Sequence, residues 1–451
     1  MKDEILVILK KLAKLGFEVA VVGGAVRDII AGQDVRDWDL TTSARPKEIL
    51  KIFPNAFYNN KFGTVGIPVE IEETEHPHVI EITTYRTEKN YSDSRHPDKV
   101  IWGKSLEEDL KRRDFTINAM ALRFKNGKLE DKPVDLFGGV SDLGNKKIRA
   151  VGDADERFRE DALRMLRAVR FATVLSFEIE EKTRKAIRDN VQLLLKISGE
   201  RIRDEIFKII DSENGDRGII LAHELAILKL ILPELDKNFI VEQKSPKRHH
   251  IYDVGTHCVM SMKHCPSTKT IVRFATLLHD IGKARVAHVT NEGIRTFYNH
   301  EVIGAKLAKE ICARFHITRD DRDKVFKLVR WHQFSVGEHQ TDKAIRRFLN
   351  NVGVENVEDM MDLRIGDRLG GGLEEPESWR LKLFRRRIKE VLKKPFGVKD
   401  LKANGRDVMR ILGIKPGPKV GNILNTLFEE VVDDNAKNER EYLLKRIKGF
   451  S

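Results

Sequence analysis

Cysteine is scarce in this sequence. Its 451 residues hold three, Cys258, Cys265 and Cys312, and no two of them form a CxxC pair. This spacing argues against a disulfide framework and against a zinc ribbon, because both need paired cysteines. We therefore expect ordinary reduced thiols in a cytoplasmic protein.

Long hydrophobic runs are also missing. No run of about 18 apolar residues occurs, so we expect no membrane-spanning helix. The N-terminal stretch MKDEILVILKKLAKLGFEVAVVGG places lysines among its apolar positions. That pattern is typical of an amphipathic helix running into a strand and not of a secretory signal peptide.

Basic residues outnumber acidic ones by 82 to 70, which gives a net charge of +12. A positive surface attracts polyanions and makes their binding salt-dependent. On charge alone, a nucleic-acid partner and a merely solvated basic surface explain the excess equally well. Hydrophobic residues make up 41% of the chain, enough for buried cores. At about 150 residues per domain, the length predicts roughly three domains.

The hydrophobic pattern divides the chain into a mixed N-terminal part and a helical remainder. Short apolar runs predict strands at 19–22, 79–84 and 119–124. From residue 157 onward the apolar period is helical. We expect four parts: an α+β head over 1–140, a helical neck and body over 141–235, a histidine-rich helical domain over 236–372 and a basic helical tail over 373–451.

The segment VVGGAVRDIIAGQDVRDWDLTT carries the most informative motif. A strand ends at Gly23 and Gly24, where the lack of a Cβ lets backbone amides approach a phosphate at the start of a helix. Arg27 follows in the first helical turn, where its guanidinium could grip a triphosphate. Asp37 and Asp39 are two residues apart, so on an extended strand they point to the same face.

Two carboxylates on one face can share divalent cations. Magnesium prefers one or two carboxylates together with phosphate oxygens and water. One such ion would activate an attacking 3′-hydroxyl and a second would stabilise a departing pyrophosphate. A DxD pair alone is more often a structural or solvated feature. The array of double glycine, Arg27, Asp37 and Asp39 is much more specific for nucleotidyl transfer.

Two further segments place charged residues suited to a nucleotide. In EEDLKRRDFTINAMAL, Arg112, Arg113 and Asp114 precede an apolar, strand-like run. Arg113 could contact a triphosphate and Asp114 could accept a hydrogen bond from a ribose 2′-hydroxyl, although a charged helix end with these two residues paired explains the same letters. In EDALRMLRAVR, Asp161 and Arg164 lie at i, i+3 on one helix face.

Asp161 and Arg164 together could read a base. Cytosine and adenine each offer an exocyclic amino donor beside a ring-nitrogen acceptor, which suits one carboxylate and one guanidinium. Guanine and uracil present the opposite pattern and would leave a buried charge unpaired, which is costly. On spacing alone, an intrahelical salt bridge is the more common explanation. Arg167 and Arg170 continue the basic stripe and face phosphate or only solvent.

These segments resemble the class II tRNA nucleotidyltransferases and their bacterial poly(A) polymerase relatives, in the polymerase β superfamily. The matching stretches run in family order over about the first half of the chain: GGAVRD, DWD, RRDFTINAMA, DLFGG, EDALRMLRAVRFA and GERIRDE. The resemblance implies a nucleotidyltransferase head followed by an all-α neck and body. It implies template-independent addition of CMP, CMP and AMP, from CTP and ATP, to the 3′ end of tRNA.

The resemblance also assigns roles to single residues. It implies that Asp37 and Asp39 bind catalytic magnesium, that Arg113 and Asp114 recognise phosphate and ribose, and that Asp161 and Arg164 act as the protein template. It matches DLFGG, with Asp135, Gly138 and Gly139, to the hinge between head and neck, and Glu200 and Arg201 to the motif that shapes the nucleotide pocket. Glu81, on a predicted strand, is a weaker candidate for a third carboxylate.

A polar stretch, TEKNYSDSRHPDKVIWGKSLEEDL, precedes the RRD segment and contains Tyr91, Asp93, Arg95 and Pro97. In the family, a loop of this type is associated with adding the terminal A, and enzymes restricted to CC addition lack it. Its presence therefore argues against a CC-only enzyme, unless the stretch is an ordinary surface loop.

A histidine-rich block forms the second candidate site. Its members follow the order H…HD…H…H…D: His257, His279, Asp280, His300, His332 and Asp367. Imidazoles with carboxylates suit transition metals such as manganese, iron, nickel or zinc. Asp280 could bridge two metals, and a bound hydroxide could then attack phosphorus. A lone buried histidine is usually a satisfied core residue, but this ordered set favours metal binding.

The block resembles the HD-domain metal-dependent phosphohydrolases over about residues 236–372. That resemblance implies phosphatase or cyclic-phosphodiesterase activity. Trp331 stands before His332 where relatives often have a second histidine, so His300 and His332 are less secure ligands than the other four. A degenerate domain that serves only as scaffold is the alternative.

Four other functions compete with CCA addition. A poly(A) polymerase or a terminal-A-only enzyme would share every residue named above. A phosphohydrolase with a vestigial head and a non-catalytic RNA-binding protein belong to other classes. The intact Asp37, Asp39 and Asp280 carboxylates argue against a pure RNA binder, which gains nothing from negative charge facing RNA. The oligomeric state cannot be deduced from the sequence.

Overall fold

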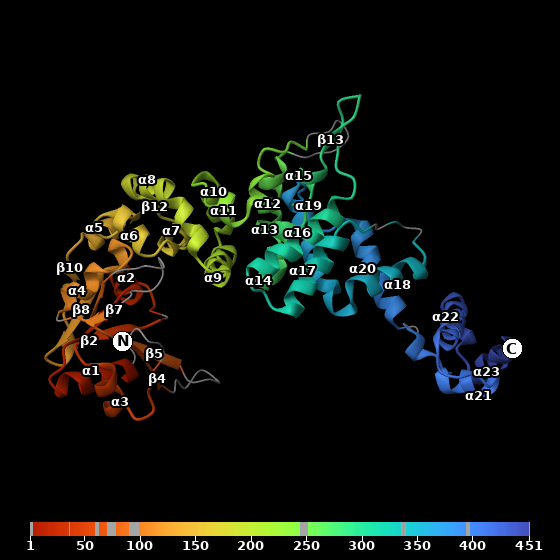
Figure 1. The fold of residues 1–451 in the computed structure, drawn as a ribbon, viewed down its shortest axis with the longest axis horizontal. Helices are drawn as coiled ribbons and strands as arrows, with labels where there is room; N and C mark the ends of the chain where they lie inside the picture. Colours follow the sequence, from red (N-terminus) through yellow and green to blue (C-terminus); the bar gives the residue numbers. More distant parts are fainter. Residues whose placement is uncertain are drawn as a thin grey trace. The chain divides into compact units, whose positions relative to one another are not determined.

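Figure 1 shows the fold of the protein in a computed structural model. The structure describes residues 3–450 apart from 36, 59–62, 70–77, 90–98, 104, 244–250, 335–336, 338–339 and 394–396. Contacts divide the chain into two compact units. The first holds residues 1–240 together with 310–318, and the second holds 241–309 and 319–451. No described helix is long and apolar enough to cross a bilayer.

The head is built on one mixed sheet. Its strands lie in the order β10 (Val134–Asp135), β8 (Met120–Lys125), β1 (Val19–Val22), β2 (Asp39–Thr42), β5 (His78–Thr84), β4 (Thr64–Val69) and β3 (Phe57–Tyr58), with β9 (Lys128–Leu129) paired to β8. Only β2 and β5 run parallel along this path, and the other neighbours are antiparallel. The strands predicted at 19–22, 79–84 and 119–124 correspond to β1, β5 and β8.

The sheet is covered on both faces, because β1 sends alternate side chains to opposite sides. Val19 and Val21 join the larger core with the helices α1 (Asp3–Lys14), α2 (Gly24–Ile30) and α3 (Pro46–Ile52). Ala20 and Val22 face a smaller core with α4 (Leu106–Lys111). Burial on both faces fixes the end of β1, and this strand end sets the position of the candidate site.

The rest of the first unit is helical, as expected. Its helices are α5 (Gly139–Gly144), α6 (Ala154–Glu160), α7 (Leu163–Leu175), α8 (Glu181–Asn190), α9 (Gly199–Ile210), α10 (Gly215–Glu224), α11 (Leu228–Ile231) and α12 (Pro233–Asp236). One exception is a two-residue parallel pair between β11 (Lys147–Ile148) and β12 (Glu178–Ile179). The fold class, an α+β head followed by a helical remainder, is confirmed.

The second unit consists almost wholly of helices. They are α13 (Val254–His264), α14 (Thr270–Leu278), α15 (Lys283–Val286), α16 (His300–Arg314), α17 (Arg319–Trp331), α18 (Asp342–Val352), α19 (Val357–Gly370), α20 (Trp379–Leu392), α21 (Gly405–Leu412), α22 (Pro418–Asp433) and α23 (Arg440–Lys448), with a small hairpin of β13 (His288–Val289) and β14 (Arg295–Thr296). A Cβ on Gly366 of α19 would lie 2.5 Å from the Ser261 carbonyl oxygen of α13. Glycine therefore lets these two helices pack closely.

Helix α16 is shared between the two units. Its residues up to 309 belong to the second unit, whereas residues 310–318 belong to the first. Within the first unit, Arg314 donates from both Nη atoms to the Glu234 carboxylate at 2.9 Å. Arg203 donates to the His316 carbonyl oxygen at 3.0 Å, and Phe315 is buried. The first unit is thus completed by a segment far along the sequence.

The polar stretch before the RRD segment is only partly described. Strands β6 (Arg86–Lys89) and β7 (Lys99–Trp102) pair antiparallel at its base. The residues between them, including Tyr91, Asp93, Arg95 and Pro97, lie outside the described part of the chain. The interpretation of this stretch as the loop associated with terminal-A addition stays a prediction.

Candidate functional site

The glycine pair marks the end of β1. Gly23 has a φ of +71°, a backbone angle that residues with a side chain rarely adopt. Helix α2 begins at the next residue, Gly24. A Cβ on Gly23 would lie 3.0 Å from Asp39 Oδ2 and 3.2 Å from Arg113 Nη1. Glycine at position 23 therefore lets the backbone, the Asp39 carboxylate and the Arg113 guanidinium come this close together.

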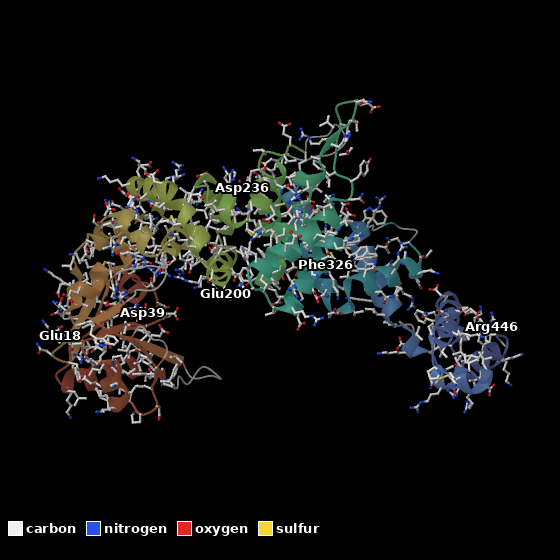
Figure 2. All side chains as sticks on the ribbon, in the orientation of Figure 1. Glu18, Asp39, Glu200, Asp236, Phe326 and Arg446 are labelled. Atoms are coloured by element: carbon white, nitrogen blue, oxygen red, sulfur yellow. The ribbon has the colours of Figure 1, made fainter. Side chains whose placement is uncertain are left out.

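Asp37 and Asp39 open into one cavity. Asp39 is the first residue of β2, while Asp37 lies in the bend before it, so only the second acid is on a strand. The alternation still holds, since Trp38 and Leu40 are buried and both acids are exposed. Figure 2 labels Asp39 on the head.

The cavity measures about 900 Å³ and lies wholly within the first unit. Its lining brings together most of the predicted nucleotide-binding residues and some that were not singled out: Gly23, Gly24, Arg27, Asp28, Gly32, Gln33, Asp34, Asp37, Asp39, Arg113, Asp114, Asn118, Arg167, Arg170, Phe171, Val174 and Leu175. This volume suits a nucleotide together with part of a second substrate.

The surroundings of Asp39 shift its ionisation. Although the Asp39 side chain reaches solvent in the cavity, the surrounding protein partly desolvates its carboxyl and raises its pKa; Arg113 opposes this, and the charge of Asp37 raises the pKa further. Two carboxylates this close repel each other, and a divalent cation would relieve the repulsion. The donor set is oxygen only, which fits a hard cation such as magnesium.

Acids that are buried or partly buried hold the arginines of the cavity wall in place. Arg27 donates to Asp28 Oδ1 at 2.9 and 2.8 Å and to Asn118 Oδ1 at 3.1 Å. Arg113 Nη2 lies 3.2 Å from Oδ2 of Asp109, a carboxylate with no exposed surface. Burial raises the pKa of Asp109, but Arg112 and Arg113 outweigh it and the net shift is downward. Asp109 therefore stays ionised.

A second set fixes the wall along α7. Arg167 donates twice to Oδ2 of Asp114, at 2.8 and 2.6 Å, and Arg170 Nε lies 2.6 Å from Glu205 Oε2. The partner of Asp114 is thus Arg167, and not Arg113 as the charged-helix-end explanation held. Burial raises the pKa of Asp114, but Arg167 outweighs it and the pKa falls below its usual value. Asp109, Asn118 and Glu205 sit inside the recognised motifs, but the sequence analysis did not single them out.

The structure separates the two residues expected to read the base. Helix α6 ends at Glu160 and α7 begins at Leu163, so the expectation that Asp161 and Arg164 share one helix face is wrong. Asp161 instead accepts hydrogen bonds from Arg201 at 2.7 and 3.3 Å. Their intrahelical salt bridge does not form among the described contacts.

Arg164 has partners of its own. Its Nη1 donates to Glu160 Oε2 at 2.7 Å and its Nη2 to the Arg112 carbonyl oxygen at 2.9 Å. Neither Arg164 nor Asp161 is among the described residues that line the cavity. Asp161 and Arg164 are therefore hydrogen-bonded to other residues beside the cavity and are not part of its described lining.

The structure also shows the surroundings of Asp135 and Glu81, which the sequence analysis named as a hinge residue and as a possible third carboxylate. Asp135 accepts hydrogen bonds from the backbone N–H groups of Gly139 and Val140, at 2.8 and 2.9 Å, after a left-handed Gly138. Glu81 on β5 pairs in register with Asp39 but is not among the described lining residues. The hinge role of the first group and the third-carboxylate role of Glu81 stay predictions.

The six residues of the histidine block meet around Asp280. Its Oδ2 lies 3.4 Å from His257 Nε2 and 3.2 Å from His279 Nε2. Its Oδ1 lies 3.1 Å from His300 Nε2 and 3.5 Å from His332 Nε2. Two ligand groups therefore share one carboxylate, the arrangement a pair of metal ions needs.

Asp367 completes the first group. Its Oδ1 lies 3.2 Å from His257 Nε2 and 3.6 Å from His279 Nε2. His300 and His332 are as closely gathered as the other four, and the neighbouring Trp331 packs under the Arg330 guanidinium at 4.2 Å. The absence of a second histidine at position 331 does not open the cluster.

The imidazoles are oriented by their backbone. His279, His300 and His332 each place Nδ1 2.7 Å from a carbonyl oxygen three residues earlier. An Nδ1–H that donates there leaves the Nε2 lone pair directed at the centre, as metal ligation requires. This repeated geometry is difficult to explain for core histidines with no ligand.

The charges of the cluster favour ionised carboxylates. Burial raises the pKa of Asp280, but His279 and Lys283 outweigh it and the pKa lies well below its usual value. Burial lowers the pKa of His279, but Asp280 and Asp367 raise it to about 10. A metal ion would replace the proton that the His279 imidazole holds.

Lys283 is a residue of this cluster that the sequence analysis passed over. Its Nζ lies 2.5 Å from Asp280 Oδ2 and 2.9 Å from Gln243 Oε1, with the side chain nearly buried. In the sequence, Lys283 could have been found from its position three residues after Asp280 in HDIGK. A buried ammonium at a metal-site carboxylate suits the binding of a phosphate oxygen.

Four family profiles match the chain in order. They are the poly A polymerase head domain over residues 19–149, the RNA and SrmB-binding site of polymerase A over 176–239, the HD domain over 248–367 and tRNA nucleotidyltransferase domain 2 over 388–447. The profile boundaries follow the mixed head, the helical neck, the histidine block and the basic end of the chain.

Whole-length relatives carry one description. The CCA-adding enzyme of Ligilactobacillus salivarius (strain UCC118) is 34% identical over 442 residues, covering 98% of this chain and 95% of the relative. That of Lactococcus lactis subsp. cremoris (strain MG1363) is 32% identical over 449 residues, covering 98% and 94%. The crystal structure of the Bacillus stearothermophilus CCA-adding enzyme in complex with CTP has a TM-score of 0.72 at 27% identity, covering 100% of this chain and 98% of that one.

Proposed function

The chain belongs to the family of CCA-adding enzymes, and on that premise we propose that it adds CMP, CMP and AMP, from CTP and ATP, to the 3′ end of tRNA without a nucleic-acid template. The observation that carries the proposal is the meeting of Gly23, Asp39 and Arg113 at one point of the cavity. It places a Cβ-free backbone, a carboxylate and a guanidinium where a triphosphate would lie.

Asp37 and Asp39 are the proposed ligands of magnesium. The ions, when bound, would activate the 3′-hydroxyl of the RNA and offset the charge of the leaving pyrophosphate. The oxygen-only donors and the raised pKa of Asp39 support this assignment. Arg27 and Arg113, each anchored by an acid, would hold the phosphates. Asp114 and the Arg167 bound to it would meet the ribose.

Reading the base would require Asp161 and Arg164 to change partners. A cytosine or adenine amino group must compete with Arg201 for Asp161, and a ring nitrogen must compete with Glu160 for Arg164. Arg201 and Glu160 would thus balance the charges of the reading pair until a nucleotide arrives. Guanine and uracil lack the matching donor and acceptor, so they could not complete the exchange.

End-labelling of an RNA substrate tests the proposal. A tRNA transcript lacking CCA is incubated with labelled CTP alone, with ATP alone and with both, and the products are sized. We expect two additions with CTP, and a third only when ATP follows. Addition of ATP but never CTP would instead support the terminal-A-only alternative, and long A tracts would support a poly(A) polymerase.

Substitution of the acids separates a working head from a vestigial one. Asp37→Ala with Asp39→Ala should abolish nucleotide addition, whereas Asp131→Ala, at an exposed carboxylate elsewhere on the head, should not. Nucleotide addition by the double variant would disprove the assignment of the two acids. Addition that survives removal of all divalent metal would likewise disprove the role of magnesium.

A second activity is favoured by the position of Asp280 between two ligand groups. We propose that the HD domain binds two transition-metal ions, manganese, iron, nickel or zinc, and hydrolyses phosphate esters or cyclic phosphodiesters. Asp280→Asn should lower both the metal content and the hydrolysis of a generic phosphate ester, whereas Asp320→Asn at an exposed site should lower neither. A wild-type protein without metal or hydrolysis would make this domain a scaffold.

A further inference from the structure

Three apolar side chains line the active-site cavity without a part in the proposed chemistry. Phe171, Val174 and Leu175 lie at i, i+3 and i+4 on one face of α7. Every other described side chain in the lining is polar or charged, or the residue is glycine. Val174 keeps 49% of its surface exposed. We call these three side chains the α7 shelf.

The aromatic member of the shelf is held in a fixed orientation. Buried Phe115 and Phe171 pack in a T-shaped, edge-to-face arrangement, with a centroid distance of 5.7 Å and an interplanar angle of 77°. The Arg170 guanidinium carbon lies 4.2 Å from the centre of the Phe171 ring, and Glu205 anchors that arginine. The Arg167 guanidinium carbon also lies over the ring, at 5.3 Å, so the ring and the guanidinium planes together form a preorganised stacking surface.

Such a surface suits a nucleobase that is not read. Bases stack on aromatic rings and guanidinium planes whatever their sequence, because each base has a π-face. The three shelf side chains offer no hydrogen-bond donor or acceptor, so they cannot tell one base from another. The incoming nucleotide must be distinguished by its base, whereas the RNA end that accepts it must be bound with any base.

We propose that the α7 shelf seats the unpaired bases at the 3′ end of the RNA that is being extended. This inference rests on the proposed function, and it adds the place where the primer end is held. Val174 lies ten residues after Arg164 on α7, which is about 15 Å along the helix axis. That separation leaves room for a read base at one end and for primer bases, about 3.4 Å apart when stacked, toward the other.

Kinetics on a short RNA with an unpaired 3′ end test the shelf. Phe171→Ala should raise KM for the RNA about tenfold, the size expected for one stacked base, and Val174→Ser should raise it a few-fold. The affinity for CTP in the absence of RNA should stay within twofold of wild type. Val7→Ser on α1 is the matched control, since Val7 is also exposed, at 61%, and lies away from the cavity.

Removal of the base itself makes the test specific. An RNA with abasic sites at its unpaired 3′ nucleotides should bind the wild type about tenfold more weakly. The same RNA should lose little further affinity when the protein carries Phe171→Ala, because the contact is already gone. Phe171→Trp should restore binding of the intact RNA. Val174→Ser changes an exposed side chain, so its folding is secure even if Phe171→Ala unfolds.

Two results would overturn the inference. An equal abasic penalty in wild type and in both shelf variants means that the bases do not touch the shelf. A loss of CTP affinity without RNA means that the incoming base sits there instead. Failure of the wild type to incorporate CTP at all would count against the proposed function, so the two failures are distinguishable.

Discussion

Arg167 directs two hydrogen bonds, at 2.8 and 2.6 Å, to a single oxygen of Asp114. This contact joins α7 to the turn before η1 (Thr116–Asn118), across 53 residues of sequence. It fixes one wall of the cavity to the other. The active-site cavity keeps its shape without a ligand, because Arg167 and Asp114 hold each other in place through these hydrogen bonds.

Asp114→Asn should weaken both the wall and the site. The amide keeps the size of the carboxylate but loses its charge, so we expect a loss of about 2 kcal/mol in unfolding free energy. KM for CTP should rise as Arg167 loses its anchor. Urea unfolding and steady-state kinetics check the two parts. Glu224→Gln, at an exposed pair with Arg184, should leave both unchanged.

Asp109 should make the head sensitive to acid. Its folded pKa lies below the usual value of 3.8, so its stabilising contribution is fully present above that pH and is lost as pH falls through the folded pKa. Asp109→Asn should cost about 3 kcal/mol at pH 7, since it leaves two arginines without their buried partner.

The difference between wild type and Asp109→Asn should shrink toward acid pH. Denaturant midpoints measured from pH 7 down to about pH 3 would show the two curves converging. Parallel curves over that range would mean that Asp109 does not change its ionisation on folding.

Gly23→Ala should disable the nucleotide site through geometry alone. The substitution adds a Cβ 3.0 Å from Asp39 Oδ2 at a backbone angle that alanine disfavours, which costs about 1–3 kcal/mol. Activity should fall about tenfold, since the Asp39 carboxylate must move by a few tenths of an ångström to admit the Cβ. Gly16→Ala is the control: Gly16 also has positive φ, but nothing lies within 4 Å of its Cβ. Equal activity of the two variants would refute the steric argument.

Metal binding to the histidine cluster should release protons. The pKa of His279 is about 10 without metal, so its imidazole is protonated at pH 7.5 and must give up that proton to become a ligand. Titration calorimetry with manganese in two buffers of different ionisation enthalpy measures the number released. We expect about one proton per protein molecule from His279, and fewer after His279→Ala. Identical heats in both buffers would contradict the prediction.

The parts of the site that are contiguous in sequence could be predicted. The double glycine, Arg27 and Asp39 fall within one strand–helix–strand segment, whereas Asp37 lies in the bend before β2 and not on a strand as predicted. Strand β1 was equally visible, because burial on both faces leaves an unbroken apolar run. Strand β5 was visible by its alternation, since Ile80 and Ile82 are buried while Val79 is exposed. These features depend on neighbours in the chain.

The parts that depend on tertiary contacts could not be predicted. The pattern EDALRMLRAVR reads as one continuous helix, yet the chain breaks at Asp161, where Arg201 from α9 binds its carboxylate. The roles of Asp109 and Glu205 were hidden for a related reason. Each acid lies on a helix like many others, and only folding shows which arginine it supports.

The shared helix α16 sets a limit on dissecting this protein. A polypeptide ending near residue 240 would lack residues 310–318, and with them the Arg314 fork on Glu234 and the buried Phe315. The N-terminal portion expressed alone would expose the apolar surface that Phe315 covers, and it would tend to aggregate. Adding a synthetic 310–318 peptide should restore its solubility, because a single cut cannot separate the two units cleanly.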